Sequence, residues 1–293
     1  MTYQSSNAFR RALEDRLQTQ STHGSVALNR LRKMVAFDRF LARLLAAQPG
    51  AWMLKGGLAL QLRLGDRART TKDMDVWLTI SRMAVHKALE QAASHDLGDW
   101  FTFVIRSDAG ALPGPDEGGL RFFVTARVDN RVFESFHIDV GLGDPVVEPA
   151  ESLTTPPLLA FAGIPPVTIP CYPISQHLAE KIHAYVKPRA SGESTRVKDL
   201  VDMVLIAAHV PVNATALSAA LQATFAAQGS GAPPTSLPAP PATWAPKYHR
   251  LARDTGLGNV TLPAAFERAR QFLDPVLSGQ TCGIWSPTAQ AWL

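Results

Sequence analysis

The stretch "MLKGGLALQLRLGDRARTTKDMDVWL", residues 53–78, holds a pair of glycines and two aspartates that are one residue apart. Gly56 and Gly57 follow the apolar letters WML and precede the apolar run LALQLRL, which indicates a strand, a turn and then a helix. A turn of this kind presents backbone N–H groups and the positive end of a helix. It is therefore suited to hold a phosphate chain.

The two aspartates, Asp73 and Asp75, flank Met74 at the start of a run typical of a strand. Side chains two residues apart in a strand lie on one face, so the two like charges repel each other unless a partner balances them. A Mg²⁺ ion bound to both carboxylates is one such partner. In the alternative interpretation, the two aspartates have a structural role and cap the turn before the strand. The glycine turn favours the metal, which would bridge the aspartates to phosphates.

A third carboxylate, Asp139, stands between Ile138 and Val140 in the run RVFESFHIDVGL. We expect this run to be an antiparallel neighbour of the strand after Asp73, with Asp139 facing the same cleft. There it would hold a second Mg²⁺ ion or activate an attacking hydroxyl. Asp144 follows a Gly-x-Gly turn, which leaves a structural role open for it.

The spacing of apolar residues divides the chain into three parts. Residues 1–50 are expected to form basic amphipathic helices packed on the core, and residues 51–170 an α/β or α+β segment with a mixed sheet. In that segment a hairpin through Asp129 and Asn130 and a helix over 83–95 are predicted. Residues 171–293 are a helical lobe, interrupted at 229–243 by a flexible or polyproline loop rich in Pro, Gly and Ala.

The first fifty residues carry eight basic and three acidic side chains, a surplus larger than the +4 of the whole chain. A helix over 28–45 is predicted from the spacing of its apolar residues, which are Leu31, Met34, Phe37, Leu41 and Leu44. The basic residues of the first fifty form either a solvated helix face or a basic face that meets a polyanion.

Several classes of protein are excluded by what the sequence lacks. The apolar runs are too short for a membrane span, and charged residues stand where a signal peptide would be apolar. Cys171 and Cys282 are far apart, so we expect a cytoplasmic protein with reduced thiols. HExxH, GxSxG, Walker A and complete dinucleotide-binding motifs are missing, which argues against hydrolases of these types and a Rossmann cofactor.

The glycine pair, the two aspartates and the later Ile-Asp-Val resemble the pattern of nucleotidyltransferases related to DNA polymerase β. The wider blocks KGGLAL, RTTKDMDV, HIDVGLGDP, YPISQHLAEKIHAYVKPR and TRVKDLVDM are similar to the AbiEii/AbiGii family of toxins from type IV toxin–antitoxin systems. The resemblance runs from about residue 50 to 210 and, more loosely, through the helical C-terminal part. It implies a two-lobed α+β fold, with an N-terminal nucleotidyltransferase-like mixed sheet and a C-terminal helical lobe.

The resemblance also implies roles for charged residues of the helical lobe. Lys181 would contact nucleotide phosphates, while Asp199 or Asp202 would complete the catalytic site as a base or a support for the metal. From the residues alone, all three are interpreted as solvated surface charges, and the resemblance favours the functional interpretation.

Further residues are expected to bind triphosphate oxygens. Arg69 and Thr71 stand just before the aspartate pair, and Arg196 or Arg189 would act from the helical lobe. Arg69 ranks first and Arg196 second, because each lies inside a block that matches the family.

The implied activity is a Mg²⁺-dependent transfer of a nucleotide from a nucleoside triphosphate to RNA, with release of pyrophosphate. The expected acceptor is the tRNA 3′ end, where the modification would block translation and growth. A cognate antitoxin encoded nearby is the expected protein partner, and no membrane is involved. The alternatives are transfer to a small molecule or a protein side chain, and a catalytically silent module that binds nucleotide or RNA.

Overall fold

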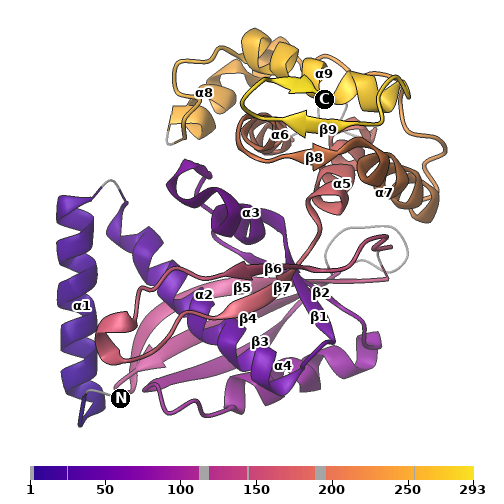
Figure 1. Cartoon of the computed structure of the whole chain (residues 1–293). Helices are drawn as coiled ribbons and strands as arrows, with labels where there is room; N and C mark the ends of the chain where they lie inside the picture. The colour runs from indigo at the N-terminus through magenta and orange to yellow at the C-terminus, as the bar shows by residue number, and fades with distance from the viewer. Residues whose placement is uncertain (1–2, 25, 112–118, 144, 189–195, 254) are drawn as a thin grey trace. The chain divides into compact units, whose positions relative to one another are not determined.

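The computed structural model describes residues 3–24, 26–111, 119–143, 145–188, 196–253 and 255–293 (Figure 1). Asp144 and Arg189, which were candidate site residues, lie outside these ranges. The chain divides into two compact units. Unit 1 comprises Met1–Leu62, Thr70–Gly143 and Ser152–Cys171, and unit 2 comprises Arg63–Arg69, Asp144–Glu151 and Tyr172–Leu293.

Among the described residues, seven strands form one mixed sheet in the order β3-β4-β5-β2-β1-β7-β6. Strand β2 pairs in parallel with β5 and β1 with β7, whereas β1–β2, β3–β4 and β4–β5 are antiparallel. This confirms the predicted mixed sheet. The strands are β1 Trp52–Lys55, β2 Met74–Leu78, β3 Phe101–Ala111, β4 Leu120–Val128, β5 Arg131–Leu142, β6 Glu151–Thr154 and β7 Thr168–Cys171.

The predicted hairpin is confirmed, because β4 and β5 are joined directly by Asp129 and Asn130. Both residues have positive φ angles, 55° and 58°, as a two-residue type I′ turn requires. Asp129 also accepts hydrogen bonds from Ser6 (2.9 Å) and Asn7 (3.0 Å), so the turn holds the start of the first helix.

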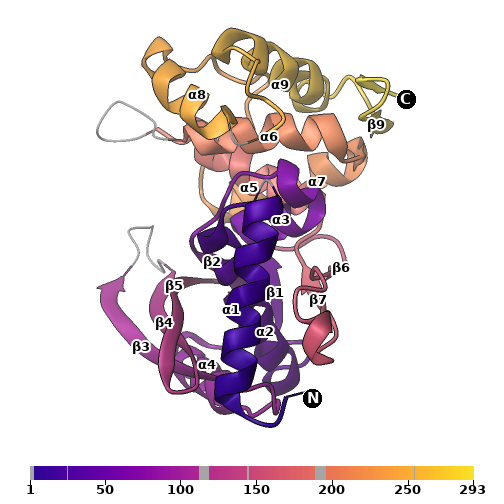
Figure 2. The same ribbon diagram turned by 90° about the vertical axis from the view of Figure 1, so that its left-hand side faces the viewer.

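Helices cover one face of this sheet (Figures 1 and 2). The bounds are α1 Ser6–His23, α2 Leu28–Ala47 and α4 Val85–Ser94, with α3 Gly56–Leu64 running from unit 1 into unit 2. Short 3₁₀ turns are η1 Gly65–Arg67, η2 Arg82–Ala84 and η3 Ala160–Ala162. The five predicted apolar positions of α2 are all buried, and Phe37 of α2 packs edge-on against Phe136 of β5 with ring centroids 5.0 Å apart.

The basic charge of the N-terminal helices is largely taken up inside unit 1. Arg43 is 1% exposed and donates two hydrogen bonds to Asp99, at 2.8 and 2.6 Å. Arg39 is likewise buried and pairs with Asp38. On the more exposed side, Arg32 pairs with Glu14, Lys33 donates to the Ser135 carbonyl, Arg10 pairs with Asp129 and Arg16 stacks over Phe161.

Arg39 and Arg43 fit neither interpretation of the N-terminal charge, whereas Arg11 and Arg16 are exposed. Buried arginines are neither solvated nor accessible to a polyanion, and a charge of this kind is buried only where a partner and hydrogen bonds compensate its lost hydration.

Unit 2 contains the predicted helical runs, which form α5 Ile174–Val186, α6 Val197–His209, α7 Ala214–Ala227, α8 Ala245–Arg253 and α9 Leu262–Leu277. In its described part a small sheet not foreseen from the sequence has the order β10-β9-β8, with β8 Val212–Asn213, β9 Ile284–Ser286 and β10 Ala291–Trp292. These strands are too short to show a period. Trp285 of β9 is buried and donates to the Ala207 carbonyl at 2.7 Å.

The segment 229–243 has irregular backbone, as expected, but the prediction that it does not pack is wrong. Leu237 is buried, and its N–H donates to Asp274 of α9 at 2.8 Å. The Pro238 carbonyl accepts from the Tyr185 hydroxyl of α5 at 2.9 Å. The segment then ends in the 3₁₀ turn η4 Ala242–Trp244, which buries Trp244.

None of the helices in the described ranges has the length and apolar character to cross a membrane.

Candidate functional site

The polar face of the unit 1 sheet carries a row of charged residues across four strands. Met74, Val76, Ile138 and Val140 are buried in the core, so the side chains that alternate with them point to the opposite face. Successive register partners on that face are Arg121 of β4, Asp139 of β5, Asp75 of β2 and Lys55 of β1. Strand pairing thus brings Asp75 and Asp139 side by side in the middle of the row.

Asp75 lies directly against the glycine turn. Gly56 has a φ of +67°, and a Cβ built on it would lie 1.9 Å from Asp75 Oδ2. Any other residue at this position would be strained in its backbone and would also displace the carboxylate. Helix α3 begins at Gly56, with Gly57 as its second residue, so the strand-turn-helix prediction is confirmed and the carboxylate meets the positive end of the helix.

Asp73 immediately precedes β2. Its side chain is 43% exposed, and its Oδ1 lies 3.5 Å from Nδ1 of His137 on β5. The ring of His137 packs edge-on against Phe123 of β4, with centroids 5.4 Å apart. The hydroxyl of Thr71 donates to the Asp73 carbonyl at 3.2 Å, so Thr71 holds the turn in which Asp73 stands.

Asp139 differs from the expectation in two ways. Its strand is a parallel neighbour of β2, not an antiparallel one, although the register still aligns it with Asp75. Both of its oxygens accept hydrogen bonds from Arg121, at 2.7 Å from Nε and 2.6 Å from Nη2. A forked guanidinium–carboxylate pair is strong and geometrically specific. Asp139 therefore lies beside Asp75 in the sheet with both of its oxygens hydrogen-bonded to Arg121.

The part of the chain that the structure describes contains no cluster of three or more His, Cys, Asp or Glu side chains arranged to hold a metal ion. A Mg²⁺ site does not need three, because this ion is commonly held by one or two carboxylates together with waters and substrate phosphates. The partly exposed carboxylates of Asp73 and Asp75 fit that requirement, whereas Asp139 fits it only when Arg121 moves away.

Three residues of this face were missed by sequence reasoning: Arg121, Phe123 and His137. Alternation along β4 and β5 was the available signal, since it places all three on the face of Asp139. The pairing of Arg121 with Asp139 also depends on a bulge, however. The register shifts between Ala126 and Arg127, where Arg127 pairs with Val132 and Ala126 with Glu134, and no sequence motif marks this shift.

Unit 2 brings together the other candidate residues in a buried ionic cluster. Lys181 Nζ lies 2.6 Å from Asp202 Oδ2 and 3.3 Å from Asp199 Oδ1. Arg69 donates to both oxygens of Asp202 at 2.9 Å, and Arg196 lies 3.6 Å from Asp199. Lys181, Asp199 and Asp202 are 7%, 3% and 1% exposed, so their description as solvated surface charges is wrong.

Lys181 and Asp202 keep their charges despite burial. Burial disfavours the charged form of Lys181, but the neighbouring carboxylates of Asp202 and Asp199 outweigh this and raise the pKa of Lys181. Burial likewise opposes charge on Asp202, and the attraction of Lys181 and Arg69 outweighs it and lowers the pKa of Asp202. The guanidinium of Arg196, 32% exposed, is the most solvent-accessible of the predicted unit 2 residues that the structure describes.

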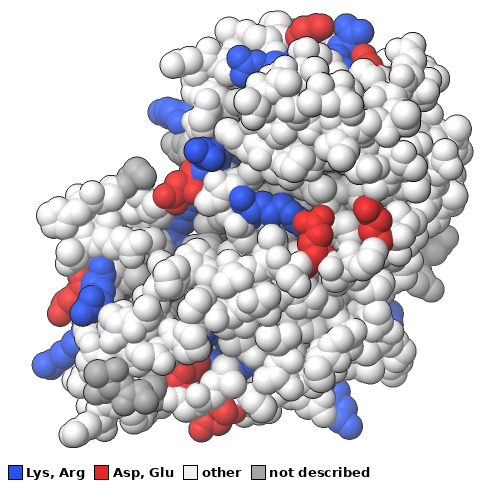
Figure 3. Space-filling model, in the orientation of Figure 1, with Lys and Arg blue, Asp and Glu red and all other residues white. Residues whose placement is uncertain are grey.

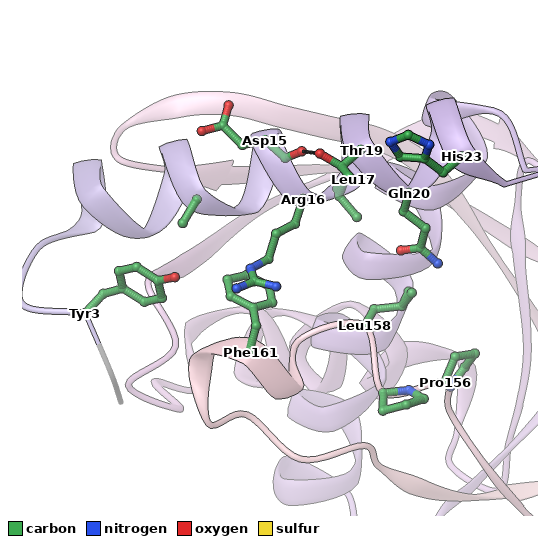
Figure 4. A pocket seen from close by; sticks show the side chains of 12 residues that line it. Tyr3, Asp15, Arg16, Leu17, Thr19, Gln20, His23, Pro156, Leu158 and Phe161 are labelled. Carbon is green, nitrogen blue, oxygen red and sulfur yellow. Dashed lines mark hydrogen bonds between the residues drawn. The ribbon is translucent and has the colours of Figure 1, made fainter.

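A separate pocket of about 810 Å³ lies between α1 and the segment 156–161 (Figure 4). Figure 4 shows the Arg16 side chain over the ring of Phe161, with a distance of 4.7 Å from its guanidinium carbon to the ring centroid. None of the predicted site residues lines this pocket, so we do not assign it to the site.

The fold is similar to that of solved structures of other proteins. The solved structure of MenT4, a nucleotidyltransferase toxin from Mycobacterium tuberculosis H37Rv, matches with a TM-score of 0.55 and 17% identity, over 92% of this chain and 98% of that chain. JHP933 from Helicobacter pylori matches with a TM-score of 0.45 and 16% identity, over 83% and 90%. None of the curated proteins compared with the chain matches it.

The likeness to MenT4 supports the fold. The family itself is shown by a family model described as the nucleotidyl transferase AbiEii toxin of a type IV toxin–antitoxin system, which matches residues 39–275. That range includes both the charged row of unit 1 and the ionic cluster of unit 2. The chain belongs to the AbiEii family of nucleotidyltransferase toxins of type IV toxin–antitoxin systems.

Proposed function

We propose that this nucleotidyltransferase toxin transfers a nucleotide, with the help of Mg²⁺, from a nucleoside triphosphate to the 3′ end of an RNA, with tRNA as the acceptor. The observation that carries the proposal is the contact between Asp75 and Gly56. It joins a carboxylate, which suits a divalent cation, to the start of a helix, which suits phosphate. A triphosphate with a bound metal ion presents both a cation, which suits the carboxylate, and phosphate oxygens, which suit the start of the helix.

Nucleotidyltransferases of this family use a nucleoside triphosphate and a divalent metal ion. We assign Asp73 and Asp75 as the residues that would hold Mg²⁺. When bound there, the ion would neutralise charge on the triphosphate. Gly56 and Gly57 would receive phosphate oxygens on their backbone, and Thr71 supports the site by fixing the turn at Asp73.

In the proposed reaction, the acceptor hydroxyl oxygen forms a bond to the α-phosphorus. The bond from the α-phosphorus to the oxygen that bridges it to the β-phosphorus breaks, and pyrophosphate leaves. Asp139 accepts the proton of the hydroxyl, and Arg121 orients the carboxylate through their two hydrogen bonds. Most of the rate enhancement would come from positioning and from neutralisation of charge.

For unit 2 we propose that Arg196 and Arg69 bind triphosphate oxygens, following the family resemblance. Asp199 and Asp202 would hold Lys181, Arg69 and Arg196 in place through their ion pairs. Because Lys181 is buried between two carboxylates, its role is expected to be the positioning of this cluster. As a member of a toxin–antitoxin family, the protein has an antitoxin partner.

The test is incubation of the protein with total tRNA, Mg²⁺ and each α-labelled nucleoside triphosphate in turn, resolved on a denaturing gel. We expect label in tRNA, no label in tRNA with a blocked 3′ hydroxyl, and loss of label with Asp75→Asn. Asp66→Asn is the matched control, because Asp66 is exposed on η1. Full transfer by Asp75→Asn would refute the proposal.

Two other outcomes would change the assignment of RNA as the acceptor. Pyrophosphate release without labelled RNA would indicate a small-molecule or protein acceptor. Binding of triphosphate without pyrophosphate release would indicate a silent binding module.

A further inference from the structure

Five of the eight N-terminal cations form ion pairs within unit 1, namely Arg10, Arg32, Lys33, Arg39 and Arg43, so much of that charge is already compensated. A row of cations without such partners is better suited to an RNA backbone. Helix α8 of unit 2 has the sequence APKYHRLAR and contains no acidic residue. Its cations Lys247, Arg250 and Arg253 follow one another at intervals of three residues, a spacing that places side chains along one side of a helix.

The three cations lie on the solvent side of α8. Tyr248 and Ala252 of the same helix are fully buried, whereas Lys247, Arg250 and Arg253 are exposed. None of the ion pairs formed between described residues involves these three cations. Figure 3 shows blue Lys and Arg atoms over the region where Figure 1 draws α8.

A neighbouring helix adds to this charge. Arg268 is exposed on α9, a helix that contacts α8. We call Lys247, Arg250, Arg253 and Arg268 the α8 basic surface.

Helix stability alone does not explain the row. Arg250 and Arg253 stand in the last turn, where cations interact favourably with the helix dipole. Lys247 stands in the first turn, where a cation is unfavourable, and like charges at this spacing repel one another. The arrangement becomes favourable when a polyanion binds along it, because each cation then neutralises a phosphate and releases a counterion.

We propose that the α8 basic surface binds the phosphate backbone of the acceptor RNA. This inference rests on the proposed RNA acceptor and adds a contact surface outside the charged row of unit 1. Contacts to phosphates fix the position of a nucleic acid without reading its sequence, so this surface would dock RNA rather than select it. The guanidinium groups suit bidentate contact with phosphate oxygens, and the lysine acts as a point charge.

The test compares two triple variants that remove the same amount of charge. The first is Lys247→Gln, Arg250→Gln and Arg253→Gln. The control is Arg11→Gln, Lys87→Gln and Arg131→Gln, at exposed positions of unit 1. Binding of fluorescent tRNA is measured at a series of salt concentrations, together with binding of a nucleoside triphosphate.

We expect the α8 variant to bind tRNA roughly 10- to 100-fold more weakly at low salt. The slope of log K against log salt should fall by about 2, because each lost phosphate contact contributes roughly 0.7–0.9. Binding of the triphosphate, and labelling of tRNA at saturating RNA, should be preserved. The control should keep the wild-type slope.

The outcomes separate this inference from the proposed function. If wild-type protein labels tRNA and the α8 variant keeps the wild-type salt slope, the inference is overturned and the proposed function stands. If wild-type protein labels no RNA, the proposed function is overturned and the inference falls with it.

Discussion

The carboxylate of Asp75 occupies the space that a side chain at position 56 would need. An ideal Cβ on Gly56 would lie 1.9 Å from Oδ2 and 2.4 Å from the carboxyl carbon of Asp75. This one relationship links the glycine turn to the aspartate pair, which are separated in sequence by the whole of α3. It makes the glycine a requirement of the site as well as of the turn.

Gly56→Ala is expected to impair both stability and activity. The φ of +67° should cost roughly 1–2 kcal/mol of unfolding free energy for a non-glycine residue, and the clash should move Asp75 and reduce transfer by at least about tenfold. Urea denaturation and the tRNA labelling assay measure the two effects. Gly50→Ala is the control, since Gly50 has a φ of +73° but open space around its Cβ position. Equal activity in the two variants would show that the contact between Gly56 and Asp75 is not required for transfer.

Arg121→Gln is expected to lower kcat more than it affects the KM for the triphosphate. The substitution removes the fork that orients Asp139, so we expect a loss on the order of 10- to 100-fold in kcat. Arg121→Lys should recover little, because an ammonium group cannot make both hydrogen bonds. Steady-state kinetics at saturating RNA, with Arg127→Gln on the same strand as control, provide the measurement. An unchanged kcat in Arg121→Gln would remove Arg121 and the orienting role from the mechanism.

Lys181→Met is expected to destabilise the protein by roughly 3–5 kcal/mol, because it leaves Asp202 and Asp199 buried with less compensating charge. Chemical denaturation measures the loss. Lys198→Met is the matched control, because Lys198 is exposed on α6 next to Asp199, and a change within about 0.5 kcal/mol is expected there. A stable Lys181→Met protein that has lost only triphosphate binding would instead identify Lys181 as a direct phosphate ligand.

Acidification is expected to weaken unit 2 through His183. Burial, and then the charge of Lys187, lower the pKa of His183 below its ordinary value of 6.5. The unfolded chain therefore takes up the proton first, and stability that is present above pH 6.5 is lost as the pH falls through the folded-state pKa. The ring of His183 packs on Phe225 of α7 and bonds Ser230 at 2.8 Å, so these contacts should loosen.

Thermal unfolding of wild-type protein and His183→Gln, compared between about pH 7 and pH 5, measures this effect. The variant should lose less stability than the wild type over that interval. His23→Gln, at an exposed position of α1, should behave as wild type. Parallel losses in wild type and His183→Gln would assign the acid sensitivity to other groups.

Local patterns in the sequence were sufficient for much of the fold. The apolar spacing of α2 and of the helices of unit 2 is a property of each segment alone, and so is the Asp129–Asn130 turn. The glycine pair and the aspartate pair were found in the same way, because their chemistry depends on neighbours within a few residues.

The pairing of strands and charges was decided only by the tertiary structure. Alternation along β2 and β5 is identical for parallel and antiparallel neighbours, so the parallel pairing of Asp75 with Asp139 could not be read from it. The register shift in the β4–β5 hairpin brings Arg121 opposite Asp139, where an unshifted hairpin would have placed Ile138. A slip of one residue exchanges the two faces of a strand.

For the charged residues, too, the sequence determined their positions along the chain, and the tertiary structure determined which of them are buried together. The sequence determined that the chain has basic N-terminal helices, a lysine in the AEK block and aspartates in the KDLVD block. It did not show that Arg43 meets Asp99, or that Lys181 meets Asp202, because these partners are distant in sequence. A charged side chain is solvated unless the fold supplies its counter-charge, and only the three-dimensional structure decides where that happens.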